Sequence, residues 1–188
     1  MARTSLGVVT VDGRTLTWRD VVRVARGGSK AKLAPAAVKR MTASRKIVAD
    51  HVAAGDVVYG VTTGFGKFAH IHIEPAHRRE LQVNLIRSHA AGVGEPFPEE
   101  VVRAMLLLRA NALAVGASGA RPVVAERLLA LLNAGVHPLI PQIGSLGASG
   151  DLAPLAHLAL VLIGEGEAIY QGRRMSGARA LKRTRIQP

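Results

Sequence analysis

The stretch that decides the fold is GSLGASGDLAPLAH, residues 144–157. It predicts a glycine-rich loop that leads into an apolar helix, expected over Asp151 to Ile163. Such a loop commonly cradles an anion or caps a helix, and on that simplest interpretation Ser149 is an N-cap. It is not a Walker phosphate loop, because no Lys-Ser/Thr pair follows the last glycine. Nor is it a nucleophile elbow, because Ser149 lacks the G-x-S-x-G frame.

The tripeptide Ala148-Ser149-Gly150 in this loop can also react with itself. If a tight turn presses the Gly150 amide nitrogen onto the Ala148 carbonyl carbon, a five-membered ring can close, and glycine tolerates the strained dihedrals that this requires. Loss of the Ser149 hydroxyl as water then leaves a methylidene-imidazolone, an electrophile that no ordinary side chain provides. A second GASG copy at 116–119 lacks the following Asp-Leu-Ala-Pro, so we expect it to stay unmodified.

Two further motifs lie upstream. Residues 59–66, YGVTTGFG, predict a glycine-rich loop, in which a tyrosine such as Tyr59 is more often a core residue with a satisfied hydroxyl. Residues 84–94, NLIRSHAAGVG, extend a helix expected from about Ala76, and a lone histidine on a helix is more often structural or exposed to solvent. His70-x-His72 has no evident third ligand, so we expect no metal site.

Together these motifs resemble the aromatic amino acid ammonia-lyase family, and the similarity runs from about Thr15 to the end of the chain. The resemblance implies a mainly α fold, with a small mixed N-terminal region leading into a helical bundle. It also implies that residues 1–188 form a single N-terminal lyase domain, truncated before the family's central bundle of long helices. The family's carboxylate-binding arginine and other site residues would lie in that missing part. We therefore expect the 188 residues alone to be weakly active or inactive.

The resemblance assigns a role to each motif. Ala148, Ser149 and Gly150 would form the family's 4-methylidene-imidazole-5-one (MIO) group autocatalytically, without a metal. Tyr59 would be the base that removes the β-proton of the substrate. Gly66 and Asp151 would support the site, the glycines by keeping the loop mobile and the aspartate by starting a helix whose positive end faces the ring.

The pair Ser88-His89 would lie against the substrate ring, where His89 can hydrogen-bond an imidazole. This pair is similar to that of the histidine-specific members, which implies histidine ammonia-lyase activity: non-oxidative deamination of L-histidine to urocanate and ammonia. One alternative is a tyrosine or phenylalanine ammonia-lyase, or a tyrosine aminomutase. Another is a catalytically inactive basic protein that binds a partner on the same scaffold. The resemblance also implies a homotetramer for the full-length form.

Composition narrows the remaining classes. The chain is 48% hydrophobic but only 3% aromatic, which is typical of a globular, mainly helical protein with an aliphatic core. The absence of cysteine excludes a disulfide scaffold and fits a reducing cytoplasm. The net charge of +12 could attract nucleic acid, but the arginines are scattered and few aromatics could stack on bases, so we do not expect such binding. We see no signal peptide, and residues 152–163 are too short an apolar run to cross a membrane.

The other expected elements follow from capping and turn residues. They are a hairpin over 8–16 around Asp12-Gly13, a helix over 18–25 capped by Thr17, helices from Pro35 to Gly55, from Pro98 to Gly116 and from Pro122 to Asn133, and a hairpin over 167–174 around Gln171-Gly172. The helix ending at Ile163 is the last clear helix in the sequence.

Overall fold

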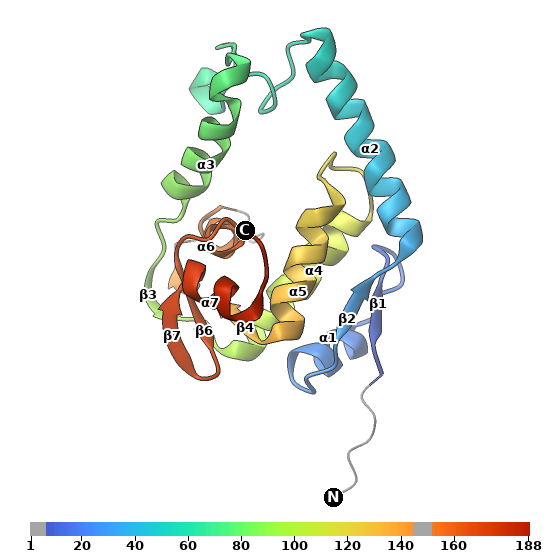
Figure 1. The fold of residues 1–188 in the computed structure, drawn as a ribbon, viewed down its shortest axis with the longest axis vertical. Coiled ribbons are helices and arrows are strands. Elements are labelled where there is room, and N and C mark those ends of the chain that lie inside the picture. Colours follow the sequence, from blue (N-terminus) through green and yellow to red (C-terminus); the bar gives the residue numbers. More distant parts are fainter. Residues whose placement is uncertain (1–6, 145–151) are drawn as a thin grey trace, which may run out of the picture.

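The computed structural model describes residues 7–144 and 152–188 and shows a mainly helical chain with three small sheets in those residues (Figure 1). The predicted fold class is confirmed. In chain order the elements are β1 (Val9–Val11), α1 (Trp18–Ala25), β2 (Ala31–Leu33), α2 (Pro35–Ala54), η1 (Gly66–Phe68), η2 (Pro75–His77), α3 (Arg78–His89), β3 (Val93–Pro96), α4 (Glu99–Ala114), α5 (Pro122–Ala134), β4 (Val136–Pro138), β5 (Pro141–Ile143), α6 (Ala153–Leu162), β6 (Glu167–Tyr170), β7 (Arg173–Ser176) and α7 (Gly177–Thr184).

The predicted N-terminal hairpin is wrong. Strand β1 instead pairs in parallel with β2, with α1 as the connection between them. The reason lies in the turn: the Asp12 carboxylate accepts the backbone N–H groups of Arg14 and Thr15, both at 2.8 Å. These hydrogen bonds lower the pKa of Asp12 to about 2. The turn therefore directs the chain into α1. The backbone N–H and C=O groups of β1 remain available to pair with β2.

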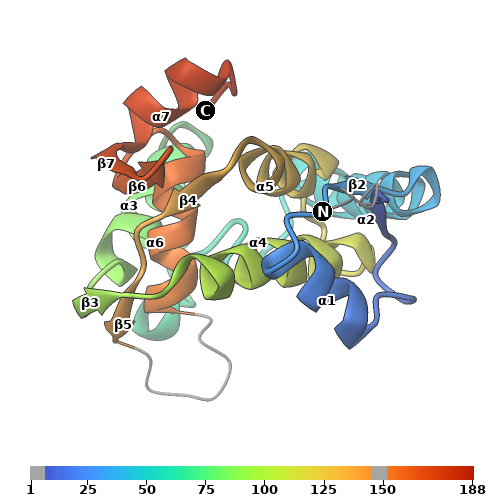
Figure 2. The same cartoon turned by 90° about the horizontal axis from the view of Figure 1, so that it is seen from below.

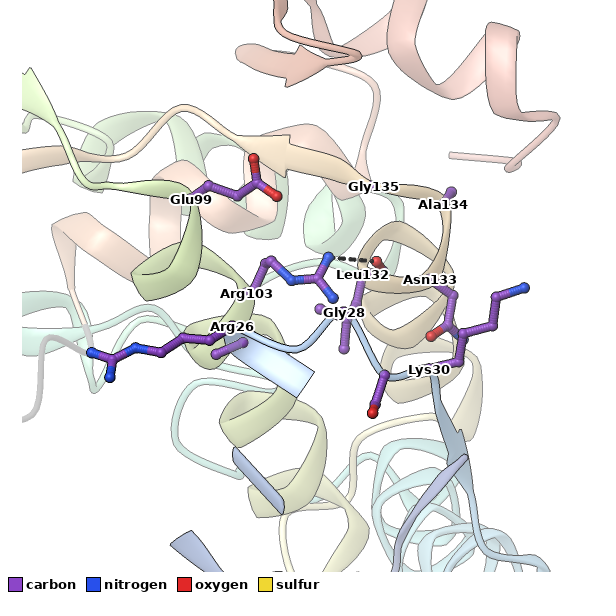
Figure 3. Close-up of a pocket in the computed structure, with 11 residues that line it drawn as sticks. Arg26, Gly28, Lys30, Glu99, Arg103, Leu132, Asn133, Ala134 and Gly135 are labelled. Atoms are coloured by element: carbon purple, nitrogen blue, oxygen red, sulfur yellow. Dashed lines mark hydrogen bonds between the residues drawn. The ribbon is translucent and has the colours of Figure 1, made fainter. Parts of the chain in front are cut away.

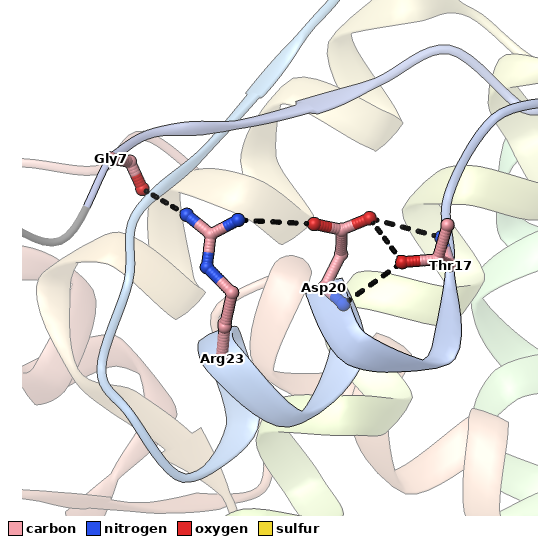
Figure 4. A network of polar contacts seen from close by, with 4 residues as sticks. All are labelled: Gly7, Thr17, Asp20 and Arg23. Carbon is pink, nitrogen blue, oxygen red and sulfur yellow. Dashed lines mark hydrogen bonds and ion pairs between the residues drawn. The ribbon is translucent and has the colours of Figure 1, made fainter.

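Helix boundaries follow the capping residues, as predicted. Thr17 and Asp20 form a reciprocal capping box at the start of α1, with N···O distances of 3.2 and 3.1 Å (Figure 4). Helices α2 and α5 each begin at a proline and end at a glycine with positive φ, Gly55 at 76° and Gly135 at 72°. Local sequence signals were sufficient for these ends.

The hydrophobic core centres on α4 and α5, against which α1, α2 and the first sheet pack (Figure 2). Its largest fully buried side chains are aliphatic, as the low aromatic content predicted. Those on the two central helices are Val102, Leu106, Leu107, Leu128, Leu131 and Leu132. The packing of α4 in this core fixes its position, and α4 also contributes to the wall of a cavity at the candidate active site.

One charged side chain is buried in this core. The Arg103 guanidinium donates from Nε and Nη2 to the Val24 carbonyl at 3.1 and 2.8 Å, and from Nη1 to the Leu132 carbonyl at 3.3 Å (Figure 3). These carbonyls lie in the last turns of α1 and α5, where the helix macrodipole favours a cation. Burial lowers the pKa of Arg103 from its usual value. Arg103 thus ties together the C-terminal ends of two helices.

The C-terminal region contains the sheet β4-β6-β7, which is antiparallel throughout. The hairpin predicted around Gln171-Gly172 is confirmed, and both residues have positive φ, 51° and 71°. Helix α7 was not predicted; it follows β7 directly, with Ser176 accepting from the Arg179 N–H at 3.4 Å. This helix is short and basic, so its apolar face of Ala180 and Leu181 gave only a weak signal. No helix in the described residues has the length and apolar character to cross a membrane.

Candidate active site

A cavity of about 560 Å³ lies where the 59–66 loop, α3, α4 and α6 meet. It brings together two of the predicted motifs and the helix that follows the third. Tyr59 and Gly66 come from the loop and His89 from the last turn of α3. The complete lining is Tyr59, Phe65, Gly66, Leu85, Ile86, His89, Arg109, Leu152, Leu155, Ala156 and Ala159.

Two buried threonines shape the loop that carries Tyr59. The Thr62 hydroxyl donates to the Asp56 carbonyl at 2.7 Å and accepts the Val58 N–H at 2.8 Å. The Thr63 hydroxyl accepts the Gly60 N–H at 3.2 Å and donates to the Gly64 carbonyl at 3.0 Å. Buried hydroxyls that are fully hydrogen-bonded hold an irregular backbone in one conformation. Sequence reasoning missed both, although their position between the two glycines of Gly-Val-Thr-Thr-Gly was a usable signal.

Tyr59 lines the cavity, and 62% of the surface of this residue is exposed. Its hydroxyl oxygen accepts the Gly66 N–H at 3.3 Å, and its ring makes an edge-to-face contact with Phe65, with centroids 5.8 Å apart at 74°. Gly60 has φ 69°, and a Cβ there would lie 2.7 Å from the Phe65 ring. Glycine is therefore required at position 60 for this aromatic pair to hold the phenol against the cavity.

His89 is half-buried, and its tautomer follows from its partners. Nδ1 lies 2.9 Å from the Leu85 carbonyl and 3.0 Å from the Ser88 hydroxyl oxygen. A carbonyl can only accept, so Nδ1 is the donor in its contact with Leu85. The Ser88 hydroxyl also donates to the Leu85 carbonyl, at 2.9 Å, and Ser88 is exposed and does not line the cavity. The structure thus brings His89 to the cavity, whereas Ser88 contacts the helix backbone and the His89 ring.

The opposite wall is apolar except for one arginine. Leu152, Leu155, Ala156 and Ala159 follow the i, i+3, i+4, i+7 spacing of one helix face. Arg109 reaches the same cavity from α4 and was not predicted. The sequence did contain a signal for Arg109. This arginine lies inside the apolar run from Met105 to Val115, at a position that the sequence does not predict to face solvent.

Ala148, Ser149, Gly150 and Asp151 lie outside the described residues, but the residues that flank them are at the site. Leu152 lines the cavity. A Cβ built on Gly144 would lie 2.9 Å from the Gly92 Cα and 3.2 Å from the Ala153 Cβ, so the backbone on both sides of residues 145–151 converges on one point.

The other histidines are not part of the cavity. His157 accepts the Gly92 N–H on Nε2 at 3.0 Å, and burial lowers its pKa. His137 is buried, with Nε2 at 3.4 Å from Arg103 Nη1 and 3.5 Å from Glu99 Oε1, and burial likewise lowers its pKa. Within residues 7–144 and 152–188, no group of three or more His, Cys, Asp or Glu side chains is arranged to hold a metal ion.

The fold and the cavity define a member of one enzyme class: the family model for aromatic amino acid lyases matches residues 16–188, and the chain belongs to this family. A curated histidine ammonia-lyase from Geobacillus thermodenitrificans is 55% identical over 181 residues, which are 96% of this chain and 36% of that protein. The chain therefore spans about a third of the length of the curated relatives it matches.

Solved structures agree with this assignment. A tyrosine aminomutase from Streptomyces globisporus superposes with a TM-score of 0.89 at 43% identity, over 96% of this chain and 34% of that one. A histidine ammonia-lyase from Trypanosoma cruzi superposes with a TM-score of 0.87 at 38% identity, over 96% of this chain and 35% of that one. The resemblance inferred from the sequence is confirmed at the level of the family.

Proposed function

We propose that the natural protein containing this chain is a histidine ammonia-lyase, which converts L-histidine to urocanate and ammonia. The observation that carries the proposal is the place of His89: it lines the cavity together with Tyr59, and the Leu85 carbonyl holds its Nδ1 at 2.9 Å. The other ring nitrogen of His89 can form a hydrogen bond with a substrate imidazole, whereas a phenyl ring offers no partner for it. The 55% identical relative named a histidine ammonia-lyase supports the same substrate.

The proposed prosthetic group from Ala148, Ser149 and Gly150 supplies an electrophile that makes the substrate amine a better leaving group. Residues that the structure describes would carry out the other steps. Tyr59 takes the β-proton on its side-chain oxygen, to which the Gly66 N–H donates a hydrogen bond at 3.3 Å. Arg109 adds positive charge to the same cavity, and the apolar face of α6 excludes water from the substrate ring.

The proposal extends to residues and partners beyond this chain. The family's further site residues and its homotetramer would complete the cavity, which here is open beside exposed apolar side chains such as Val57, Phe68 and Ile71. We therefore propose that the 188-residue chain by itself is weakly active or inactive. A cytoplasmic location belongs to the same proposal, on the basis of the cysteine-free composition.

A substrate panel on the purified natural protein tests the activity. L-histidine should give urocanate, followed by its ultraviolet absorbance, with a kcat/KM well above that for L-tyrosine and L-phenylalanine. The tyrosine aminomutase structures make a tyrosine-acting enzyme the second candidate. Formation of β-tyrosine or of an aryl acrylate, with no urocanate, would establish that candidate and reject the first.

Substitution of His89 tests the recognition step separately. His89→Leu in the natural protein should lower kcat/KM for histidine by about 10- to 100-fold, because the loss leaves the substrate ring N–H without an acceptor, a cost of about 1–3 kcal/mol. Turnover of phenylalanine should be unchanged or raised. The exposed His77→Leu at the start of α3 is the control and should leave both unchanged. An equal loss for both substrates would contradict a ring-recognition role.

A further inference from the structure

Residues 59–73, which we call the base loop, fold back on themselves. Thr63 and His72 form an antiparallel β-bridge across the loop. Beside that bridge, the Ile73 N–H donates to the Thr62 carbonyl at 2.8 Å. Because these contacts close the loop, its end at Ile73 and the segment around Thr62 must move together.

Two side chains of α3 are hydrogen-bonded to carbonyl groups of the base loop. Arg78 Nε donates to the Ile73 carbonyl at 3.0 Å, and this contact is partly buried. Gln82 Nε2 donates to the Gly60 carbonyl at 3.3 Å, in a more exposed place. Gly60 directly follows Tyr59 in the chain, so α3 is bonded to both ends of the base loop.

The backbone next to Tyr59 is held on both sides of Gly60. The Gly60 N–H donates to the Thr63 hydroxyl at 3.2 Å, and the Gly60 carbonyl accepts from Gln82. Gly60 has φ 69°, a conformation that glycine adopts without strain. A rotation of the chain directly after Tyr59 would therefore break at least one of the two bonds.

The same face of α3 carries these two donors and part of the cavity wall. Arg78 and Gln82 are followed on this face by Leu85, Ile86 and His89, with the spacing i, i+4, i+7, i+8 and i+11. The last three of these residues line the cavity, whereas the two donors do not. One continuous helix thus fixes both the base loop and the histidine that faces the substrate ring.

We propose that Arg78 and Gln82 are positioning residues for the base: they hold the base loop against α3, so that Tyr59 and His89 meet the same substrate molecule. This inference rests on the proposed function and adds two residues to it. Neither side chain lines the cavity, so each acts through the loop backbone. A general base must lie within reach of its proton, and a misplacement of about 1 Å can cost about 100-fold in rate.

Hydrogen exchange of the natural protein, followed by mass spectrometry of peptides that cover residues 57–74, tests the two contacts without measuring catalysis. Arg78→Met and Gln82→Leu should each speed exchange in these peptides by about 3- to 10-fold, the equilibrium weight of one intramolecular hydrogen bond. Arg78→Lys, whose ammonium group can donate to the Ile73 carbonyl, should restore most of the protection. Peptides from α4 and α5 should be unchanged, which establishes that each variant is folded.

The effect on catalysis is measured in the double variant with Arg78→Met and Gln82→Leu. Its kcat for histidine should fall by about 10- to 100-fold, with a KM within about threefold of wild type, because the base is displaced and the α3 wall is not. Arg79→Met is the matched control. Arg79 is the next residue on α3, is exposed, and makes no side-chain hydrogen bond or ion pair with the described residues. Its substitution should change neither exchange nor kcat.

The outcomes separate this inference from the proposed function. Unchanged exchange of the base loop in both single variants would overturn the positioning role. A double variant with faster exchange and the kcat of wild type, or one whose loss lies in KM alone, would overturn it as well. A wild-type protein that forms no urocanate would reject the proposed function instead, and the exchange data would still decide whether Arg78 and Gln82 hold the loop.

Discussion

Tyr59→Phe in the natural protein is expected to lower kcat for histidine deamination by about 10²- to 10⁴-fold, the usual contribution of a general base. The KM should change little, because the phenyl ring keeps its edge contact with Phe65 and its place in the cavity wall. The hydroxyl is bonded to the Gly66 N–H alone among the described residues, so its loss should cost little stability. Urocanate absorbance under saturating histidine measures the effect.

Tyr170→Phe is the control for this prediction. Its hydroxyl also accepts one hydrogen bond, from the Gln171 side chain at 3.5 Å, and it lies on β6 away from the cavity. It should retain wild-type kcat. Peptide masses across Ser149 should show the same ring closure in both variants, which separates loss of the base from loss of the prosthetic group. A Tyr59→Phe protein with a normal ring and a kcat within a few-fold of wild type would rule out Tyr59 as the base.

Arg103→Met should give the largest loss of stability of any single substitution discussed, about 2–5 kcal/mol in the free energy of unfolding. Methionine keeps the apolar stem but removes the donor of the Val24 carbonyl and one of two donors of the Leu132 carbonyl, which keeps the Gly135 N–H at 3.3 Å. Both carbonyls belong to helix ends that the guanidinium cation stabilises. Urea unfolding followed by circular dichroism measures the change.

The control for Arg103 is Arg179→Met on α7, an exposed helical arginine whose side chain makes no hydrogen bond or ion pair in the described part of the chain. Its effect should stay within about 0.5 kcal/mol. If Arg103→Met lost less than the control, the buried guanidinium would contribute nothing net, as happens when desolvation offsets the hydrogen bonds of a buried charge.

Much of the secondary structure was accessible from the sequence because its signals are local. The Thr17 capping box, the prolines that begin α2 and α5, and the glycines that end them act within a few residues of the helix end. The N-terminal hairpin failed because the Asp12 carboxylate takes the turn's N–H groups and β2, twenty residues away, supplies the partner strand. Helix α7 was not predicted because its eight residues are shorter than the window over which a helical period is identified.

The sequence by itself determined the family, because the GASGDLAP stretch, Tyr59 and His89 are identifiable by residue type and spacing alone. Only the tertiary structure decided which of these meet. It brought Tyr59 and His89 to one cavity, kept Ser88 out of its lining, added Arg109, and joined Gly92 to Gly144 and His157. The physical reason is that a contact between residues far apart in the chain depends on how the intervening helices pack, and no local pattern specifies that packing.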